Sequence, residues 1–474
     1  MDDKNEIRKI TMAELFPLII EMKAKHWRLV QICAVSIEQG YEMSYSFCKN
    51  EEYRMVTLRL EVGEEETIAS ITPIYPCAFL QENEAAELFG VKIENISPNY
   101  QDKLYRIDEV APFKKKEQKM AKRSIVPFGP QHPVLPEPVH LDLVLEDETV
   151  VGAIPSIGYI HRGLEKLVEK RDFKQYVYIA ERVCGICSCG HGMGYCESVE
   201  KVMGIEVPRR AEYLRTIWME MSRVHSHLLW LGLLADAMGF ESLFMESWRL
   251  REKILDMFDK TAGGRIILSV NCVGGVLKDM DGGMLQGVLH AIEDLEKEIK
   301  PVIDTFLEDY TVQSRLKGTG ILSRENAIAM GAVGPTLRAS GEAYDIRMLG
   351  YAAYKDLSVE PIIEKEGDCY ARCEVRLREL LQSFALIREA IQKIPEGPIA
   401  VPVKGNPKGE YFMRIEQPRG EAIYYVKGNG TKYLDRFRLR TPTTSNIPPM
   451  VEMLKGCQLA DVPLLILTID PCVS

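Results

Sequence analysis

Thiol and charged side chains crowd into one short segment of the chain, Glu181-Arg182-Val183-Cys184-Gly185-Ile186-Cys187-Ser188-Cys189-Gly190-His191. Cys184 and Cys187 are three residues apart, a spacing at which two thiolates can bind one soft metal ion while the glycine between them lets the backbone turn. The C-x-x-C pattern is ambiguous by itself, because thioredoxin-like dithiols and zinc sites share it. A thioredoxin-like dithiol would need a βαβ setting, which the flanking sequence lacks, and a zinc site would need two more ligands. We expect Cys189 and Cys196 to be buried thiols rather than ligands.

Two regions far along the chain could supply further ligands. Cys369 and Cys373 lie four residues apart in a strongly helical run, where we expect them to share one packed face rather than to bind zinc. Cys472 belongs to Asp470-Pro471-Cys472, directly after the apolar run Val462–Ile469. We expect this run to be a buried strand, because leaving it in water would cost about 25 cal/mol per Å² of apolar surface. Such a strand would carry Cys472 into the interior, where its thiol could serve as a ligand.

Composition limits the classes of protein to which these thiols can belong. The chain has 474 residues, 46% hydrophobic and 27% charged, with a net charge of −10, which is ordinary for a globular protein of two or three domains. We expect no membrane span, because no apolar stretch approaches the roughly 18–20 residues that crossing a bilayer requires. Residues 1–6 lack the features of a signal peptide, so the twelve cysteines indicate a reducing cytoplasm rather than a disulfide framework. The negative charge argues against nucleic-acid binding.

One boundary divides the chain. Residues 111–123 read APFKKKEQKMAKR, a charge-rich run without apolar periodicity, and we place a linker at 113–123 between domains at 1–112 and 124–474. Helical and strand-like patterns before the linker predict a small α+β domain. The expected elements are a helix at Met12–Lys25, strands at Arg28–Glu38, Tyr41–Cys48, Arg54–Glu61 and Thr67–Pro76, and a helix starting in Glu84–Phe89. This domain carries no motif tied to chemistry, which is typical of a docking module.

The second domain is predicted to be mainly helical and closed by β-rich segments, so that the whole chain belongs to the α+β class. A β-hairpin is expected at Val139–Leu145 and Glu148–Ile154. Long stretches of helical periodicity follow, at about 162–203, 208–239, 245–262, 281–310, 323–332 and 367–394. From Gly397 the pattern returns to strands and turns.

These motifs together resemble the large subunits of nickel–iron hydrogenases, and most closely the membrane-bound, energy-converting group 4 branch that includes formate-hydrogenlyase-type enzymes. The residues that match the paired cysteine motifs of the hydrogenases are Arg182–Cys187, His191 and Asp470-Pro471-Cys472. Other stretches resemble the related 49-kDa, quinone-site subunit of complex I: GPQHP at 129–133, GYIHRGLEKL at 158–167, SHLLWLG at 226–232, GPTLRASG at 334–341 and RTPTTSNIP at 440–448. Residues 1–112 resemble the 30-kDa subunit of complex I, fused in front.

The resemblance implies a nickel ion held by four cysteine thiolates, two of which bridge to an iron that carries cyanide and carbon monoxide. On that pattern Cys184 and Cys472 are terminal nickel ligands and Cys187 is a bridging ligand. Thiolate suits this role because soft sulfur stabilises nickel and is deprotonated by it. His191 matches the histidine that hydrogen-bonds the bridging sulfur.

The resemblance also assigns roles around the centre. The Pro418-Arg419-Gly420 motif places Arg419 over the iron, where it would polarise the pocket or join an acid–base pair, oriented by Asp470. Thr443 matches a hydroxyl that donates to a cyanide. Proton exit needs a chain of carboxylates, and the candidates in matching segments are Glu137, Glu165 and Glu181.

One feature departs from the family pattern. The second family motif is Asp-Pro-Cys-x-x-Cys, whereas this sequence stops at Ser474, one residue before the second bridging cysteine. Three explanations stay open: a sequence cut short, a selenocysteine codon interpreted as a stop, or a relative whose cluster is altered. Gene sequence beyond codon 474 would separate them.

The implied activity is the reversible reduction of protons to H2, coupled to electron transfer and ion translocation, in a complex on the inner face of the cell membrane. The implied partners are an iron–sulfur small subunit like the 20-kDa subunit of complex I, a ferredoxin-like iron–sulfur subunit, antiporter-like membrane subunits, and formate dehydrogenase or ferredoxin. Iron–sulfur clusters are expected only in those partners, since the chain lacks a four-cysteine ferredoxin pattern. The alternative is a complex I-like subunit without hydrogenase activity, in a quinone- or sulfur-linked ion-pumping complex.

Overall fold

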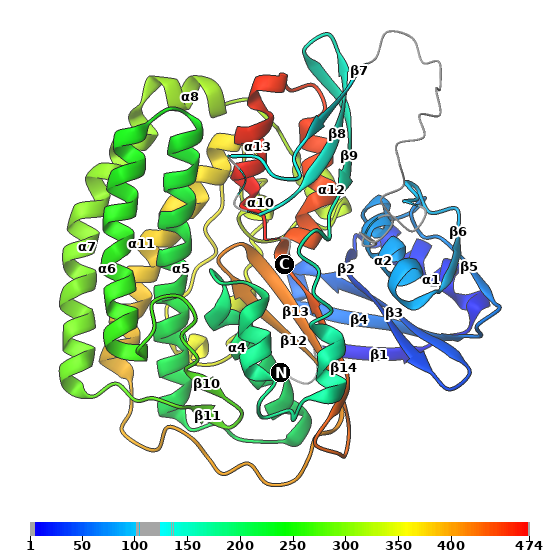
Figure 1. Cartoon of the computed structure of the whole chain (residues 1–474), viewed down its shortest axis with the longest axis horizontal. Coiled ribbons are helices and arrows are strands. Elements are labelled where there is room, and N and C mark those ends of the chain that lie inside the picture. The colour runs from blue at the N-terminus through cyan, green and yellow to red at the C-terminus, as the bar shows by residue number, and fades with distance from the viewer. Residues whose placement is uncertain (1–4, 101–103, 105–123, 134, 136, 473–474) are drawn as a thin grey trace.

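The computed structural model describes residues 5–100, 104, 124–133, 135 and 137–472. The linker predicted at 113–123 lies outside the described residues. Figure 1 shows a helical body joined to a small N-terminal sheet domain, with the β12–β14 sheet between them. This arrangement confirms the predicted fold class.

The N-terminal domain is a four-stranded sheet with strand order β1-β4-β3-β2 and a small parallel pair, β5 and β6. Its elements are β1 (Asn5–Lys9), α1 (Met12–Ala24), β2 (Arg28–Ile37), β3 (Gly40–Lys49), β4 (Arg54–Val62), β5 (Thr67–Ala69), α2 (Phe79–Phe89) and β6 (Lys92–Glu94). α1 starts where Thr11 and Glu14 form a reciprocal capping box, which satisfies two backbone N–H groups at the helix end. The strand predicted over Thr67–Pro76 ends at Ala69, and α2 begins five residues earlier than predicted.

Four long helices form the body of the large domain, α5 (Arg209–Ala237), α6 (Glu241–Ala262), α7 (Gly282–Glu308) and α11 (Cys369–Lys393). Figure 1 shows them side by side. Their connections carry the short β10 (Asn271–Cys272) and β11 (Gly275–Val276) and the short helices α8 (Tyr310–Leu316), α9 (Arg324–Ala329) and α10 (Gly334–Arg338). α5 is buried along nearly its whole length, so it is the centre of the helical core.

The long helix predicted over 162–203 is wrong. The segment instead forms a 3-10 helix (Glu165–Lys170), α3 (Val177–Ala180), a second 3-10 helix (Glu181–Val183) and α4 (Ser188–Met203). Cys184 has an extended backbone and breaks the helical path. Apolar periodicity continues through this break, because the segments on both sides of it are buried, and periodicity alone therefore missed it.

Two three-stranded antiparallel sheets complete the large domain. They consist of β7 (Ser124–Phe128), β8 (His140–Glu146) and β9 (Thr149–Ser156), and of β12 (Lys408–Gln417), β13 (Gly420–Asn429) and β14 (Leu434–Arg440). β8 and β9 confirm the predicted hairpin, and β12–β14 confirm the predicted return to strands.

The strand predicted over Val462–Ile469 is wrong, because this run is the helix α13. It follows α12 (Pro442–Leu454), and it packs on α5, α11 and α12 without joining a sheet. A short, continuous apolar run cannot distinguish a buried strand from a buried helix, and here the first-turn proline suits a helix start. The inference that the run is buried is correct.

Candidate metal centre

The three cysteines singled out in the sequence meet in the interior. Cys184 lies in the extended link before α4, Cys187 precedes the first residue of α4, and Cys472 follows α13. Their sulfur atoms all lie within 4.8 Å of one another, and their exposed fractions are 3%, 1% and 0%. Within the described part of the chain this is the one group of His, Cys, Asp and Glu side chains close enough to hold a metal ion.

Arg419 lies directly over the thiols. Its Nη1 is 3.3 Å from the Cys187 sulfur and 3.7 Å from the Cys184 sulfur, and its Nε is 2.9 Å from Asp470 Oδ1. Burial opposes the guanidinium charge, but Asp470 and the three thiols outweigh it and raise the pKa of Arg419. The site therefore holds a fixed cation against sulfur.

The pKa values of the three thiols are shifted in different directions. Contacts with Cys187 and Cys472 lower the pKa of Cys184 well below its usual value, and His191 and Arg419 lower it further. The contact with Cys184 raises the pKa of Cys187, and contacts with both other thiols raise the pKa of Cys472. The metal-free cluster therefore favours a thiolate at Cys184, whereas a bound metal would deprotonate every coordinated thiol.

Two glycines fix the turn that carries Arg419. Gly334 at the start of α10 has φ +63°, and Gly420 at the start of β13 has φ +130°. A Cβ on Gly334 would lie 2.3 Å from the Cα of Gly420, so the two backbones cross where no side chain fits. This crossing pins the Pro418-Arg419 turn and accounts for a glycine in each motif.

Two threonines hold the backbone of Cys472. The Thr443 hydroxyl accepts a hydrogen bond from the Cys472 N–H at 2.6 Å, and the Thr441 hydroxyl donates to the Cys472 carbonyl at 3.2 Å. Thr441 precedes α12 and Thr443 lies in its first turn. Thr443 keeps its own proton for another acceptor, which is compatible with the donor role that the resemblance implies.

His191 lies on α4 with its ring between two environments. Its Nδ1 is 3.0 Å from the Tyr424 hydroxyl and 3.2 Å from Gln417 Nε2. Its Nε2 has no hydrogen-bond partner among the described residues, although the ring lies close enough to Cys184 to lower the pKa of that thiol. The resemblance implies a hydrogen bond from His191 to the bridging Cys187. In this structure, the thiol whose pKa His191 lowers is Cys184. Sequence reasoning missed Tyr424 and Gln417; position 417, directly before Pro418-Arg419, was the available signal.

The three relay candidates lie in different environments. Glu137 Oε1 is 3.8 Å from the Cys184 sulfur and lines an open cavity of about 470 Å³. Glu181 is buried with the Ser269 hydroxyl at 2.8 Å, and burial raises its pKa to about 7. Glu165 accepts from Arg436 at 2.7 Å and from the Leu439 N–H at 2.9 Å, so the structure places it in a salt bridge rather than against the thiols.

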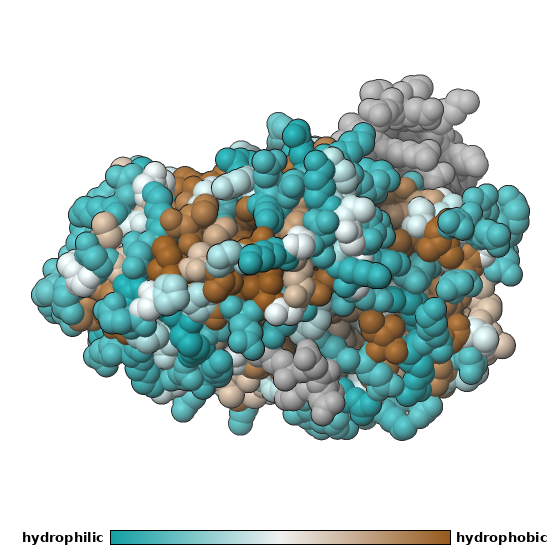
Figure 2. Space-filling view, turned by 90° about the horizontal axis from the view of Figure 1, so that it is seen from below, coloured by the Kyte–Doolittle hydropathy of each residue, from teal (hydrophilic) through white to brown (hydrophobic). Residues whose placement is uncertain are grey.

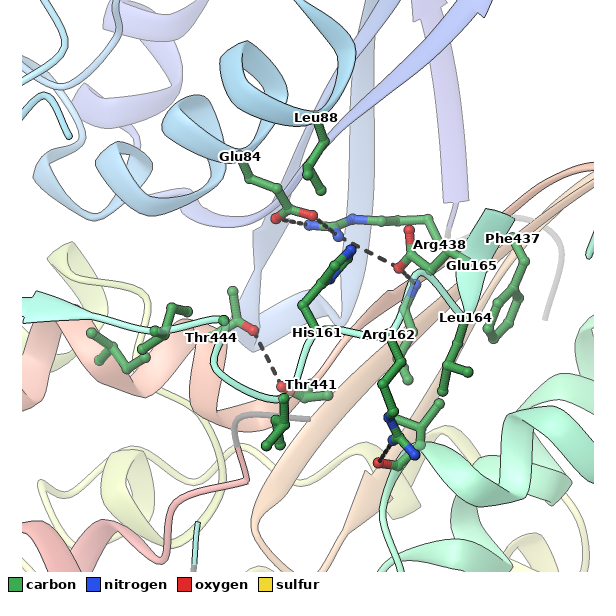
Figure 3. A pocket seen from close by; sticks show the side chains of 16 residues that line it. Glu84, Leu88, His161, Arg162, Leu164, Glu165, Phe437, Arg438, Thr441 and Thr444 are labelled. Carbon is green, nitrogen blue, oxygen red and sulfur yellow. Dashed lines mark hydrogen bonds and ion pairs between the residues drawn. The ribbon is translucent and has the colours of Figure 1, made fainter. Parts of the chain in front are cut away.

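Glu165 lines a second cavity, of about 110 Å³, shown in Figure 3. Glu84 from α2 pairs there with Arg438, and Thr441 lies 3.2 Å from Thr444 across the opposite wall. Arg162 donates to the backbone carbonyls of Arg182 and Val183 at 2.9 and 3.1 Å. The cavity therefore lies at the junction of the two domains, and its lining includes Val183, which precedes Cys184, and Thr441, which bonds to the Cys472 carbonyl.

Comparison with known families agrees with this geometry. Residues 162–237 match the family model described as nickel-dependent hydrogenase, and residues 237–406 and 402–474 match the 49-kDa subunit of respiratory-chain NADH dehydrogenase. Residues 8–121 match the 30-kDa subunit of the same dehydrogenase. The carbon monoxide-induced hydrogenase of Rhodospirillum rubrum is 37% identical over 74% of this chain and 98% of its own length. The chain belongs to the hydrogenase and complex I large-subunit family.

Other members of this large-subunit family extend the match. The membrane-bound hydrogenase subunit alpha of Pyrococcus furiosus is 37% identical over 74% of this chain and 86% of its own length. A chain of a membrane-bound sulfane sulfur reductase, an archaeal respiratory membrane complex, aligns with a TM-score of 0.71 at 31% identity, over 74% of this chain and 97% of that one. The predicted resemblance is confirmed, and the chain is an oxidoreductase-family large subunit. Among its described helices, none has the length and apolarity of a membrane span.

Proposed function

We propose that this chain is the large catalytic subunit of a membrane-associated nickel–iron hydrogenase complex that interconverts protons and H2. The observation that carries the proposal is the buried group of Cys184, Cys187 and Cys472 beneath the guanidinium of Arg419. Ordinary core packing has no need of three converging thiols, nor of a buried arginine facing them.

The residues fit a soft metal centre. The three donors are thiols, and His191, whose buried Nε2 has no partner in the described chain, lies close enough to Cys184 to lower the pKa of that thiol. Cys184 and Cys472 would hold nickel, and Cys187 would be a further ligand of the same nickel–iron group, whose iron carries carbon monoxide and cyanide. That centre supplies the redox chemistry of proton reduction when it is bound.

The protein's own groups supply charge and proton transfer around that centre. Arg419 stays protonated because Asp470 and the sulfurs stabilise its charge, so it favours negative charge that develops beside it. Glu137 lies close enough to Cys184 to exchange a proton with its sulfur, and it lines an open cavity through which water can reach it. We assign Glu137 as the first proton acceptor, Glu181 as a second candidate, and Glu165 as a structural carboxylate.

Electrons would leave through an iron–sulfur small subunit, and antiporter-like membrane subunits would couple the reaction to ion movement. We place the chain on the inner face of the membrane, as a peripheral subunit of that complex. Figure 2 shows that apolar side chains gather near the centre of one otherwise hydrophilic face. Patches of this kind are typical of protein–protein contacts.

The decisive experiment is metal analysis and infrared spectroscopy of the purified complex. We expect one nickel per large subunit, iron in excess of nickel because the iron–sulfur subunits add their own, H2 evolution with a reduced low-potential donor, and bands for iron-bound CO and CN⁻. A complex that contains the full chain but no nickel and no such bands would exclude the proposal. Replacing Glu137 by Gln should slow H2 evolution at unchanged metal content, while Glu165→Gln, its matched control, should affect stability first.

The second candidate is a complex I-like subunit that acts on a quinone or on sulfur. It is favoured by the match of residues 237–474 to the 49-kDa subunit and by the fold of the sulfane sulfur reductase chain. A metal-free complex that reduces a quinone, or a metal-containing one that reduces polysulfide without H2 evolution, would establish it.

A further inference from the structure

We propose that Tyr424 and Gln417 are positioning residues that hold His191 in one tautomer, with Nδ1 as acceptor and Nε2–H directed at the cysteine sulfurs. This inference rests on the proposed function, since it assigns the means by which the chain tunes its metal-binding thiols. Tyr424 and Gln417 would act on the metal centre only through His191.

One hairpin carries both this pair and Arg419. β12 ends at Gln417, Pro418 and Arg419 form the turn, and β13 runs from Gly420 past Tyr424. The hairpin thus delivers a guanidinium to the sulfurs on one side and two polar groups to His191 on the other. A single rigid element sets both positions, so their spacing does not depend on loop motion.

The hydrogen-bond donors around Nδ1 decide the tautomer. Gln417 Nε2 donates to the Tyr424 oxygen at 2.7 Å and lies 3.2 Å from Nδ1, and an amide nitrogen can only donate. The Tyr424 hydroxyl has its own proton to give, and its contact with Nδ1, at 3.0 Å, is shorter than its contact with its other acceptor, the Gly190 carbonyl, at 3.4 Å. Nδ1 of a neutral ring is therefore the acceptor, and the ring proton resides on Nε2. That nitrogen is buried without a partner in the described chain, and the ring lies close enough to Cys184 to lower the pKa of that thiol.

The glycine-rich face of α4 makes room for this arrangement. A Cβ on Gly194 would lie 2.4 Å from the Tyr424 ring, and a Cβ on Gly190 would lie 3.2 Å from Gln417 Nε2. His191 and Tyr424 also meet edge to face, with centroids 6.1 Å apart. Glycine costs helix stability, so two glycines on one buried helix face indicate a requirement for close approach. The pair is therefore seated in a fitted recess against α4.

The test uses the purified holo complex with Tyr424→Phe and Gln417→Ala, and infrared spectroscopy of iron-bound CO and CN⁻. Each variant should retain nickel and iron but shift these bands and the midpoint potential of the centre in the same direction, since a weaker hydrogen bond leaves more charge on sulfur. Tyr425→Phe is the matched control: it lies on the same strand and is equally buried, and its hydroxyl is bonded to Glu410 at 2.6 Å. It should leave bands and potential unchanged.

Unchanged bands in both Tyr424→Phe and Gln417→Ala would overturn the inference, and so would an equal shift in Tyr425→Phe. Gln417→Glu gives an independent check, because a carboxylate beside Nδ1 would draw a proton to that nitrogen and should move the bands further than Gln417→Ala. Failure of the proposed function is distinguishable, because the unmodified complex would then lack the CO and CN⁻ bands altogether.

Discussion

Two buried regions of this molecule neutralise the charges of their arginines in different ways. At the junction of the two domains three guanidinium groups meet carboxylates: Arg28 and Arg440 pair with Glu421 at 2.8 and 2.6 Å, and Arg59 pairs with Glu410 at 2.6 Å. At the thiol centre Arg419 faces three sulfurs and one carboxylate.

Both regions leave some buried polar atoms without a hydrogen-bond partner in the described chain, and Arg28 Nη1 is one such atom at the junction. Around the thiols, His191 Nε2, both ring nitrogens of His225 and one oxygen of Asp470 lack hydrogen-bond partners within the described residues. Buried polar atoms are rarely left unpaired without a reason, and a site built to receive a group from outside the chain is such a reason. The comparison separates charge that holds the domains together from charge arranged for chemistry.

The largest effect is expected at the thiols. Replacing Cys184, Cys187 or Cys472 individually by Ser should abolish nickel retention and H2 evolution, because hydroxyl oxygen is a harder donor that is not deprotonated as readily. Nickel per chain, measured by elemental analysis, checks the expectation. Cys48→Ser provides the control, since that buried thiol contacts Tyr344 and Arg414 rather than the cluster. Full nickel content in all three variants would show that these thiols are not nickel ligands.

The next effect concerns stability at the domain junction. Glu421→Gln should lower the free energy of unfolding by about 3–5 kcal/mol, because it leaves Arg28 and Arg440 buried without a counter-charge. Denaturant unfolding of the purified chain measures it. Glu6→Gln, which breaks the exposed pair with Arg54, should cost less than about 1 kcal/mol. Equal effects for the two variants would show that burial does not distinguish these pairs.

Arg419→Lys tests the role of the arginine at the thiol centre. Lysine keeps the positive charge but loses the planar fork that reaches the Cys187 sulfur and Asp470 together. We expect H2 evolution to fall about 10²–10³-fold, the usual effect of removing one preorganised charge donor, with nickel content and unfolding free energy nearly unchanged. A variant that instead unfolds like Glu421→Gln would place Arg419 with the structural arginines.

The parts of this picture that the sequence predicted differ in kind from those it missed. Cys184, Cys187, Cys472 and Arg419 were found because their motifs are short and chemically distinctive, and the structure brings them together. The helix α13 was mistaken for a strand, since an apolar run is buried in either conformation.

The missed site residues depended on long-range geometry. Tyr424 and Gln417 acquire their meaning only when β12 and β13 pair and lie against α4, which no local pattern encodes. The salt-bridge role of Glu165 is similar, because its partners Arg436 and Leu439 lie more than 270 residues away along the chain.

The smallest effect is expected at Glu197, on α4. Burial raises its pKa to about 8, and Arg215, the positive charge that opposes this shift most, is already paired with both oxygens of Glu200. The folded state therefore holds a proton that the unfolded chain loses near its ordinary carboxyl pKa, so this group makes stability fall as the pH rises from about 4.5 to 8.

Glu197→Gln should remove that slope and raise the free energy of unfolding at pH 8 by at least about 1.4 kcal/mol, the equivalent of one pKa unit, with little change at pH 5. Unfolding curves at the two pH values give the measurement. Glu206→Gln is the control, because this carboxylate is exposed and lines a surface cavity that Glu197 also lines. An unchanged pH slope in Glu197→Gln would mean that the carboxyl is already stabilised in its charged form. In that case a surplus buried carboxylate costs little here, and the unpaired polar groups at the thiol centre would lose their significance as a mark of function.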